Sequence, residues 1–202
     1  MPEDPQLSTD PAAEPDAKVT HGRKSKPPSP PNPWIEALQT IGLSVVLALG
    51  IRQFVAEARY IPSGSMEPTL LVHDRLVVEK VSYHFNDPAR GDVVVFWPPI
   101  DASPTGQRDA FIKRIIGLPG DTVEIANQQV IINGSVLQED YIKAAPEEDW
   151  GPETVPEGMF LMLGDNRNSS YDGRAWGFVA QEDIIGRAAF RFWPINRIGG
   201  ID

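Results

Sequence analysis

The chain contains no cysteine, which excludes disulfides, thiolate nucleophiles, Cys-ligated zinc and iron–sulfur clusters. Only three histidines occur in 202 residues (His21, His73 and His84), so no histidine-rich metal site is expected. The formal net charge is −10 at pH 7, and the chain lacks the basic footprint typical of proteins that bind nucleic acid.

Large apolar side chains are scarce in the first 33 residues, which instead hold nine of the twenty prolines. Such a segment cannot offset the entropy lost on ordering, so residues 1–33 are expected to form a disordered arm. Its acidic residues come early, and its basic residues come directly before an apolar run: Lys18, Arg23, Lys24 and Lys26. Positive charge in that position favours a cytoplasmic arm.

A single long apolar run begins at Trp34. As a helix, the 22 residues from Trp34 to Val55 would span about 33 Å, enough to cross a hydrocarbon core of about 30 Å. Three interpretations fit the run. The first is a membrane anchor over residues 34–57, which the long preceding arm favours. The second is a cleaved signal peptide ending at Ala56-Glu57-Ala58, and the third is a buried core helix.

Residues 58–202 show short segments rich in Val, Ile and Phe, punctuated by Gly, Pro and Asn, with no clear helical period. The pattern predicts a mostly β fold: a compact antiparallel sheet or barrel-like domain, preceded by a single N-terminal transmembrane helix. Asn133-Gly134 predicts a β-hairpin. The expected strands cover residues 76–79, 92–97, 111–116, 122–126, 129–132, 159–163 and 184–193.

The segment IPSGSMEPTL, from Ile61 to Leu70, places two serines one glycine apart. In an extended chain Ser63 and Ser65 point to the same side, and Gly64 lets a substrate backbone approach closely. One hydroxyl can attack a carbonyl while the other donates a hydrogen bond to the resulting oxyanion. Pro, Ser and Gly are also turn residues, so on these residues alone a plain turn is the commoner explanation.

The histidines are poor candidates for the base that an attacking serine needs. His21 lies in the arm and His84 in a loop-like segment. His73 is eight residues from Ser65 and next to Asp74, where we expect a partly exposed turn.

Lys113 is the better candidate for the base. It lies in FIKRIIGLPGD, where a strand would place Phe111, Lys113 and Ile115 on one face and Arg114 on the other. Burial among apolar side chains can lower the pKa of a lysine by about 3–5 units, enough to provide a neutral amine near physiological pH. The alternative is an ordinary lysine on the solvent face of a strand.

Four segments, in this order behind the apolar run, resemble the bacterial type I signal peptidases, also called leader peptidases. They are PSGSMEPTL (62–70), RGDVVVFWPP (90–99), KRIIGLPGD (113–121) and GDNRNSSYDGR (164–174). The resemblance covers roughly Trp34 to the C-terminus, and four blocks in order are far more specific than any one of them.

The resemblance implies a role for each matching residue. Ser65 is the expected nucleophile and Lys113 the general base. Ser63 and the backbone N–H of Ser65 form the oxyanion hole, and Ser170 hydrogen-bonds and orients the lysine. The substrate pockets are expected to be lined by Ile61, Pro62, Met66, Leu70, Phe111 and Ile112. Polar residues expected to hold the site together are Asp165, Arg167, Asp172 and Arg174.

The sequence departs from the family pattern at two positions. His73 replaces a glycine that usually precedes the aspartate, so the turn after Leu70 is expected to differ. Ser169 stands where asparagine is frequent. The segment between Gly120 and Gly164 is short, which indicates a minimal catalytic domain.

The implied function is removal of signal peptides from exported preproteins by a membrane-anchored Ser/Lys endopeptidase that cleaves after Ala-x-Ala sites, without metal or cofactor. The expected partners are signal peptides and membrane lipid. The expected setting is a bacterial plasma membrane, or a thylakoid membrane in a photosynthetic cell, with the catalytic domain outside. Two rival hypotheses are a self-cleaving Ser/Lys repressor, for which a DNA-binding domain is lacking, and a non-enzymatic anchored β domain.

Overall fold

The computed structural model describes residues 32–99, 102 and 109–201. Nearly all of the expected arm, residues 1–33, lies outside these described residues. The chain divides into two compact units, Met1–Thr40 and Ile41–Asp202, each of which is considered by itself.

Helix α1 (Pro33–Phe54) is the apolar run identified in the sequence. Asn32 precedes it and its side-chain oxygen accepts a hydrogen bond from the Trp34 N–H at 3.1 Å, while Pro33 suits the first helical position. None of the 22 residues is buried, which contradicts the core-helix interpretation. Among the described residues, α1 is the one helix long and apolar enough to cross a membrane.

The helix ends at Phe54, so the predicted boundary at residue 57 is wrong by three residues. Strand β1 (Ala56–Tyr60) begins there instead, because its backbone pairs antiparallel with β2 (Arg75–Glu79), from Ala56 opposite Glu79 to Tyr60 opposite Arg75. The β domain therefore begins two residues earlier than predicted. Ala56-Glu57-Ala58 lies within this hydrogen-bonded strand.

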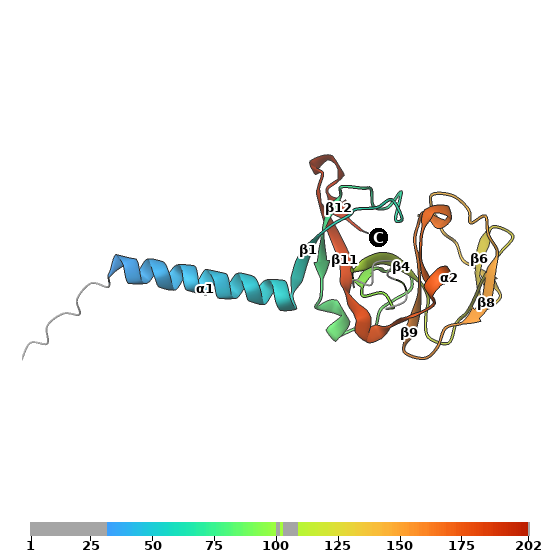
Figure 1. The fold of residues 1–202 in the computed structure, drawn as a ribbon, viewed down its shortest axis with the longest axis horizontal. Helices are drawn as coiled ribbons and strands as arrows, with labels where there is room; N and C mark the ends of the chain where they lie inside the picture. The colour runs from blue at the N-terminus through green and yellow to red at the C-terminus, as the bar shows by residue number, and fades with distance from the viewer. Residues whose placement is uncertain (1–31, 100–101, 103–108, 202) are drawn as a thin grey trace, which may run out of the picture. The chain divides into compact units, whose positions relative to one another are not determined.

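The larger sheet of the described chain has eight strands and curls into a half-barrel (Figure 1). Its order is β1-β2-β11-β3-β4-β9-β10, with β12 paired to β11, and every pairing is antiparallel. The remaining bounds are β3 (Val93–Phe96), β4 (Phe111–Gly117), β9 (Met159–Leu163), β10 (Val179–Ala180), β11 (Ile184–Trp193) and β12 (Gly199–Gly200).

A second sheet, of four strands, has the order β7-β6-β5-β8 (Figure 1). Its members are β5 (Thr122–Ala126), β6 (Gln129–Ile132), β7 (Ser135–Val136) and β8 (Trp150–Thr154). Asn133 and Gly134 join β6 to β7 with φ angles of 53° and 79°, which confirms the predicted hairpin and suits a tight turn.

The mostly β fold with one N-terminal apolar helix is confirmed, as are all seven predicted strands to within a residue or so. Strands β1, β7, β8, β10 and β12 were not predicted. The other helices that lie wholly within the described residues are one turn long: η1 (Ser82–His84), η3 (Arg167–Ser169), α2 (Gly173–Trp176), η4 (Gln181–Asp183) and η5 (Ile195–Arg197).

Three clusters of buried apolar side chains support the sheets. One cluster, around Met66, Leu76 and Val78, packs beneath the segment that follows β1. A second includes residues from the smaller sheet, such as Val123 and Ile125, together with residues of β4 and β9. The third contains Val94, Phe96 and Ile115 from β3 and β4. Strand β4 contributes to the second and third clusters, so its backbone is held rigidly, and this strand carries the candidate base.

Candidate active site

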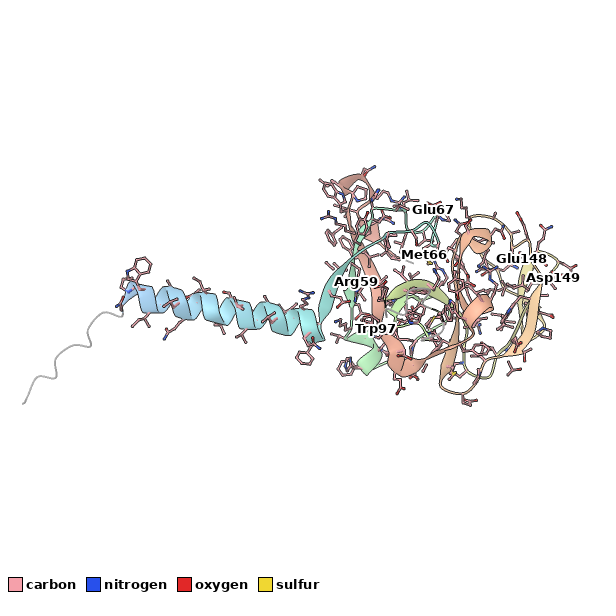
Figure 2. The ribbon with its side chains drawn as sticks, viewed as in Figure 1. Arg59, Met66, Glu67, Trp97, Glu148 and Asp149 are labelled. Atoms are coloured by element: carbon pink, nitrogen blue, oxygen red, sulfur yellow. The ribbon has the colours of Figure 1, made fainter. Side chains whose placement is uncertain are left out.

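The loop after β1 carries Ser65 and is held from beneath and from the side. Met66 lies inside the domain with no exposed surface, whereas Glu67 lies nearer the surface (Figure 2). Asn166 fixes the loop by two hydrogen bonds: its backbone N–H donates to the Ser65 carbonyl at 3.1 Å, and its side-chain amide donates to the Gly64 carbonyl at 3.0 Å. The Ser65 hydroxyl is therefore presented from a well-anchored backbone.

Lys113 meets Ser65 across the site. The two residues are 48 positions apart in sequence, yet Lys113 Nζ lies 2.6 Å from Ser65 Oγ. Lys113 is in β4, paired with Val94 of β3, and only 5% of its surface is exposed. The solvent-face alternative for this lysine is therefore wrong.

The environment of Lys113 favours its neutral form. Burial lowers the pKa of the Lys113 amine to about 8, against the opposing attraction of Asp172 and Asp165. Among the described residues no carboxylate forms an ion pair with this amine. A lysine with such a pKa is partly deprotonated near pH 7 and can accept a proton from an adjacent hydroxyl.

Arg114, the next residue of β4, is also buried, but its charge is fully matched. Its guanidinium donates to both carboxylate oxygens of Asp165, at 2.9 and 2.8 Å, and to the Gly91 carbonyl at 2.7 Å. The Thr69 hydroxyl donates to the same carboxylate at 2.5 Å. The guanidinium also lies 4.0 Å from the centre of the Tyr141 ring. This network links β4, the loop that carries Ser65 and the segment after β9.

The segment from Gly164 to Arg174 closes on itself through the predicted polar residues. Asp172 accepts hydrogen bonds from the Arg174 side chain at 2.9 and 3.1 Å and from the Gly164 N–H at 3.1 Å. Arg167 is buried and forms a bidentate pair with Glu139, at 2.8 and 2.5 Å. These contacts fix the segment internally and to Glu139, while Asp165 and Asn166 join it to the loop of Ser65.

A pocket of about 620 Å³ opens beside the Ser65–Lys113 pair. Pro62, Phe111 and Ile112, three of the residues expected to contact substrate, line it. Residues Ile61, Met66 and Leu70 do not line it: they lie in the core, at most 2% exposed, because they are the apolar side chains that anchor the loop. For these three the expectation of substrate contact is corrected to a packing role.

Ser63 and Ser170 differ in how closely the structure fits their expected roles. Ser63 is exposed and lines the pocket beside Ser65. The Ser170 hydroxyl is buried and makes no hydrogen bond to any described residue, so the expected bond to Lys113 is not formed in this structure. Gly164 has no room for a side chain, because the Ser170 hydroxyl and the Ser65 carbonyl lie against its Cα.

Neither His73 nor His84 is part of the site, and His21 lies outside the described residues. His73 is exposed, contacts the Tyr60 hydroxyl, and does not line the pocket. Its φ angle of 76° is the left-handed conformation that glycine favours, which explains why a glycine is expected at this position. His84 is exposed at the end of η1.

Several residues of the site were not predicted. Arg114, Glu139 and Tyr141 form buried polar networks, and Asn166 fixes the nucleophile loop. Arg114 and Asn166 do lie within the blocks that carry the resemblance, and a buried charge requires a partner. Nothing in the sequence near Glu139 indicates its pairing with Arg167.

The geometry can be compared with known proteins. Residues 34–193 match the model of the family described as signal peptidase, peptidase S26. The chain is 59% identical over 174 residues to a signal peptidase I of Leptolyngbya laminosa, covering 85% of this chain and 86% of that one. It is 54% identical over 181 residues to a probable signal peptidase I-2 of Synechocystis, covering 90% and 83% of the two chains. It is also 38% identical over 196 residues to a probable thylakoidal processing peptidase 2 of Arabidopsis thaliana, covering 92% of this chain and 53% of that one.

Proposed function

The chain belongs to the signal peptidase, peptidase S26, family, and from this membership we propose a specific mechanism and setting for it. It is a peptidase of the signal peptidase I type. The proposal is that it is a membrane-anchored serine endopeptidase that removes signal peptides from exported preproteins after a small residue, using Ser65 as nucleophile and Lys113 as general base.

The observation that carries the proposal is the contact between a buried amine and a hydroxyl, with Lys113 Nζ 2.6 Å from Ser65 Oγ. With an ordinary pKa, deprotonating a lysine at pH 7 costs about 5 kcal/mol. At a pKa of about 8 that cost falls to about 1 kcal/mol. Burial of Lys113 thus supplies the free base that the reaction needs.

In the first half of the reaction, neutral Lys113 takes the proton of Ser65 as the serine oxygen attacks the scissile carbonyl. The carbonyl oxygen becomes an oxyanion, which the Ser63 hydroxyl and the Ser65 N–H stabilise. The Ser65 N–H donates to no other group among the described residues, which leaves it available for this role. Each such donor is worth about 3–4 kcal/mol in comparable hydrolases.

In the second half, the Lys113 ammonium donates its proton to the leaving amine as the peptide bond breaks. The signal peptide remains esterified to Ser65. Neutral Lys113 then takes a proton from water, which attacks the ester and releases the signal peptide, and the proton returns to Ser65. The chain's own groups account for every proton, so the mechanism uses neither metal nor cofactor.

The substrate would lie extended along a free strand edge. Residues 111–113 of β4 pair with β3 on one side, whereas β9 pairs with β4 only from Arg114 onward. The other edge of residues 111–113 borders the pocket, where a peptide backbone can add as a strand. Alternate residues of that peptide share one side, so the first and third residues before the cleaved bond face the same wall, as an Ala-x-Ala site requires.

Helix α1 would anchor the enzyme in the membrane that its substrates cross. In this proposal residues 1–33 form a cytoplasmic arm, the helix spans the bilayer, and the β domain lies outside. Tethering raises the concentration of the active site near emerging cleavage sites. The cyanobacterial relatives and the relative named as a thylakoidal enzyme support a plasma membrane or a thylakoid membrane as the setting.

The test is incubation of the purified full chain in lipid vesicles with a preprotein, followed by mass spectrometry of the new N-terminus. A product that begins directly after an Ala-x-Ala site is expected from the wild type and not from Ser65→Ala. A serine-directed acylating probe should label Ser65 and no other serine. Absence of both cleavage and labelling in a folded protein would favour the rival non-enzymatic β domain.

A further inference from the structure

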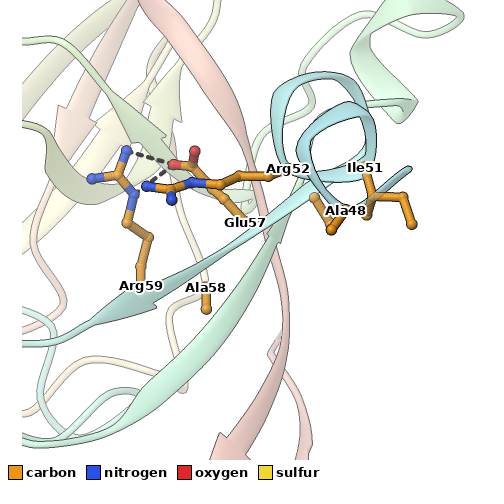
Figure 3. A pocket seen from close by; sticks show the side chains of 7 residues that line it. Ala48, Ile51, Arg52, Glu57, Ala58 and Arg59 are labelled. Atoms are coloured by element: carbon orange, nitrogen blue, oxygen red, sulfur yellow. Dashed lines mark hydrogen bonds and ion pairs between the residues drawn. The ribbon is translucent and has the colours of Figure 1, made fainter. Parts of the chain in front are cut away.

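A second pocket, of about 690 Å³, lies where α1 ends and β1 begins (Figure 3). One wall comes from the last turns of the helix, where Ala48, Ile51 and Arg52 occupy positions i, i+3 and i+4 and so share a face. The other wall is residues 56–59 of the strand. Both walls therefore combine apolar and charged side chains.

The charged residues that line this pocket, Arg52, Glu57 and Arg59, carry a net positive charge. Glu57 pairs with Arg59 at 2.5 Å and with Lys80 at 2.8 Å, and Figure 3 shows the contact with Arg59. Burial acts to raise the pKa of the Glu57 carboxyl, but Lys80 and Arg59 outweigh it and lower the pKa below its ordinary value. Glu57 is thus ionised and already shared by two cations. The Arg52 guanidinium pairs with no carboxylate among residues 32–99, 102 and 109–201.

Arg59 connects this pocket to the catalytic one, because its side chain lines both. Glu57 and Arg59 lie opposite Val78 and Leu76 in the β1–β2 ladder, so they share the inner face of the sheet with two core residues. The Glu57 carboxylate fixes the Arg59 side chain at the boundary between the two pockets. A peptide that passed Arg59 from the catalytic pocket would therefore reach the second pocket.

We propose that the second pocket is a substrate subsite that binds the C-terminal turn of the signal peptide's apolar helix, upstream of the cleaved bond. This inference rests on the proposed function and extends it from the cleavage site to the membrane-embedded part of the substrate.

The chemistry of the helix wall fits that occupant. An apolar segment within a bilayer must be helical to satisfy its backbone, and its last four carbonyls have no partner within the helix. Those carbonyls carry partial negative charge, which a guanidinium complements. Arg52 offers such donors where the chain leaves the lipid, while Ala48 and Ile51 offer a small, apolar surface for the preceding turn.

The experiment compares two substrates in neutral phosphatidylcholine vesicles. One is a full preprotein, and the other is a short peptide that spans its cleavage site and lacks the apolar segment. Arg52→Ala is expected to lower kcat/KM for the preprotein about tenfold, mainly through KM, and to change that for the short peptide less than twofold. Gln53→Ala, on the same helical turn but outside the pocket, is the matched control and should leave both values unchanged.

A second measurement does not depend on the fold of an Arg52 variant. A photocrosslinking residue at the end of the preprotein's apolar segment, mixed with inactive Ser65→Ala enzyme, should crosslink to residues 48–52. Crosslinks confined to other parts of the chain would overturn the subsite.

The remaining outcomes separate the subsite from its rivals. Equal effects of Arg52→Ala on both substrates, or no effect on either, would overturn the subsite while leaving the peptidase intact. A loss for both substrates seen only when vesicles contain phosphatidylglycerol would assign the pocket to an anionic lipid headgroup instead. Failure of the wild type to cleave either substrate would overturn the proposed function and the subsite with it.

Discussion

Strand β4 carries two buried basic side chains on consecutive residues, Lys113 and Arg114. One of them has a carboxylate partner and the other does not. The Arg114 guanidinium is held by both oxygens of Asp165, at 2.9 and 2.8 Å. Lys113 forms no ion pair with any described carboxylate and instead contacts the Ser65 hydroxyl. Successive residues of a strand face opposite sides, so one strand places one basic side chain in a salt bridge and the other in the proposed active site.

The difference shows how one rigid strand can serve structure and catalysis at once. A buried charge with a bidentate partner fixes the backbone, because breaking the pair would leave an uncompensated charge. A buried amine without such a partner is driven towards its neutral form, with a pKa of about 8. The ion pair of Arg114 therefore holds the amine of Lys113 at the correct distance from Ser65.

The largest expected effect on activity comes from removing the amine of Lys113. Lys113→Met keeps the volume of the side chain and removes the base, so kcat should fall about 10⁴-fold. Thermal unfolding at pH 7 should show no loss of stability, because an amine that resists protonation in the fold has been removed. Retention of more than a tenth of the activity would contradict the assignment of Lys113 as the base.

Breaking the ion pair between Arg114 and Asp165 should instead reduce the stability of the fold. Asp165→Asn leaves Arg114 buried and uncompensated, which should lower the free energy of unfolding by about 3–5 kcal/mol. The matched control is Glu67→Gln, which removes a half-exposed pair with Lys143 and should cost less than about 1 kcal/mol. Denaturant unfolding measures both values. Equal losses of unfolding free energy in the two variants would show that the buried pair contributes no more to stability than the partly exposed one.

Sequence reasoning identified Lys113 and Ser65 because their evidence is local. The alternation of Phe111, Lys113 and Ile115 in an apolar strand predicts one buried face, and the Ser63–Ser65 spacing predicts paired hydroxyls. The resemblance supplied the roles that alternation alone leaves open. For the same reason seven strands with clear apolar patterning were predicted, and the hairpin at Asn133-Gly134 was found.

The pairing of Arg114 with Asp165 could not be predicted from local patterns. The two residues are 51 positions apart, and only the folded sheet brings them together. Strand β1 was missed because Ala56–Tyr60 lacks β-branched residues and is defined by pairing with β2. The substrate role expected for Met66 and Leu70 was wrong because an apolar residue next to a nucleophile can face the core as readily as the pocket.

The pH dependence of activity should report the titration of Lys113. Lys113 must be neutral to act as the base, so kcat/KM should rise about tenfold per pH unit and level off above about pH 8. Between pH 6 and 8 the neutral fraction grows about 50-fold. A rate that stays flat from pH 6 to 8, with chemistry limiting, would contradict a titrating lysine.

The same pKa has a consequence for stability. The pKa of Lys113 is about 8 in the fold and near its ordinary value of 10.5 when unfolded. Between those values the unfolded state binds more protons, so stability should rise with pH from about 8 to about 10.5. That rise should be weaker in Lys113→Met, and parallel melting curves over this range measure the difference.

The smallest effect is expected at Ser170, which the sequence predicts as the residue that orients Lys113. Its hydroxyl is buried beside Gly164 and has no hydrogen-bond partner among the described residues. Catalytic hydrogen bonds are often long in a free enzyme and shorten when substrate binds. We therefore expect the hydrogen bond between the Ser170 hydroxyl and the Lys113 amine to form only during the reaction. Ser170→Ala should then lower kcat about fivefold and shift the ascending pH limb. Ser135→Ala, whose side chain is exposed in the smaller sheet away from this pocket, should do neither. Identical pH profiles for the two variants would mean that Ser170 only fills space.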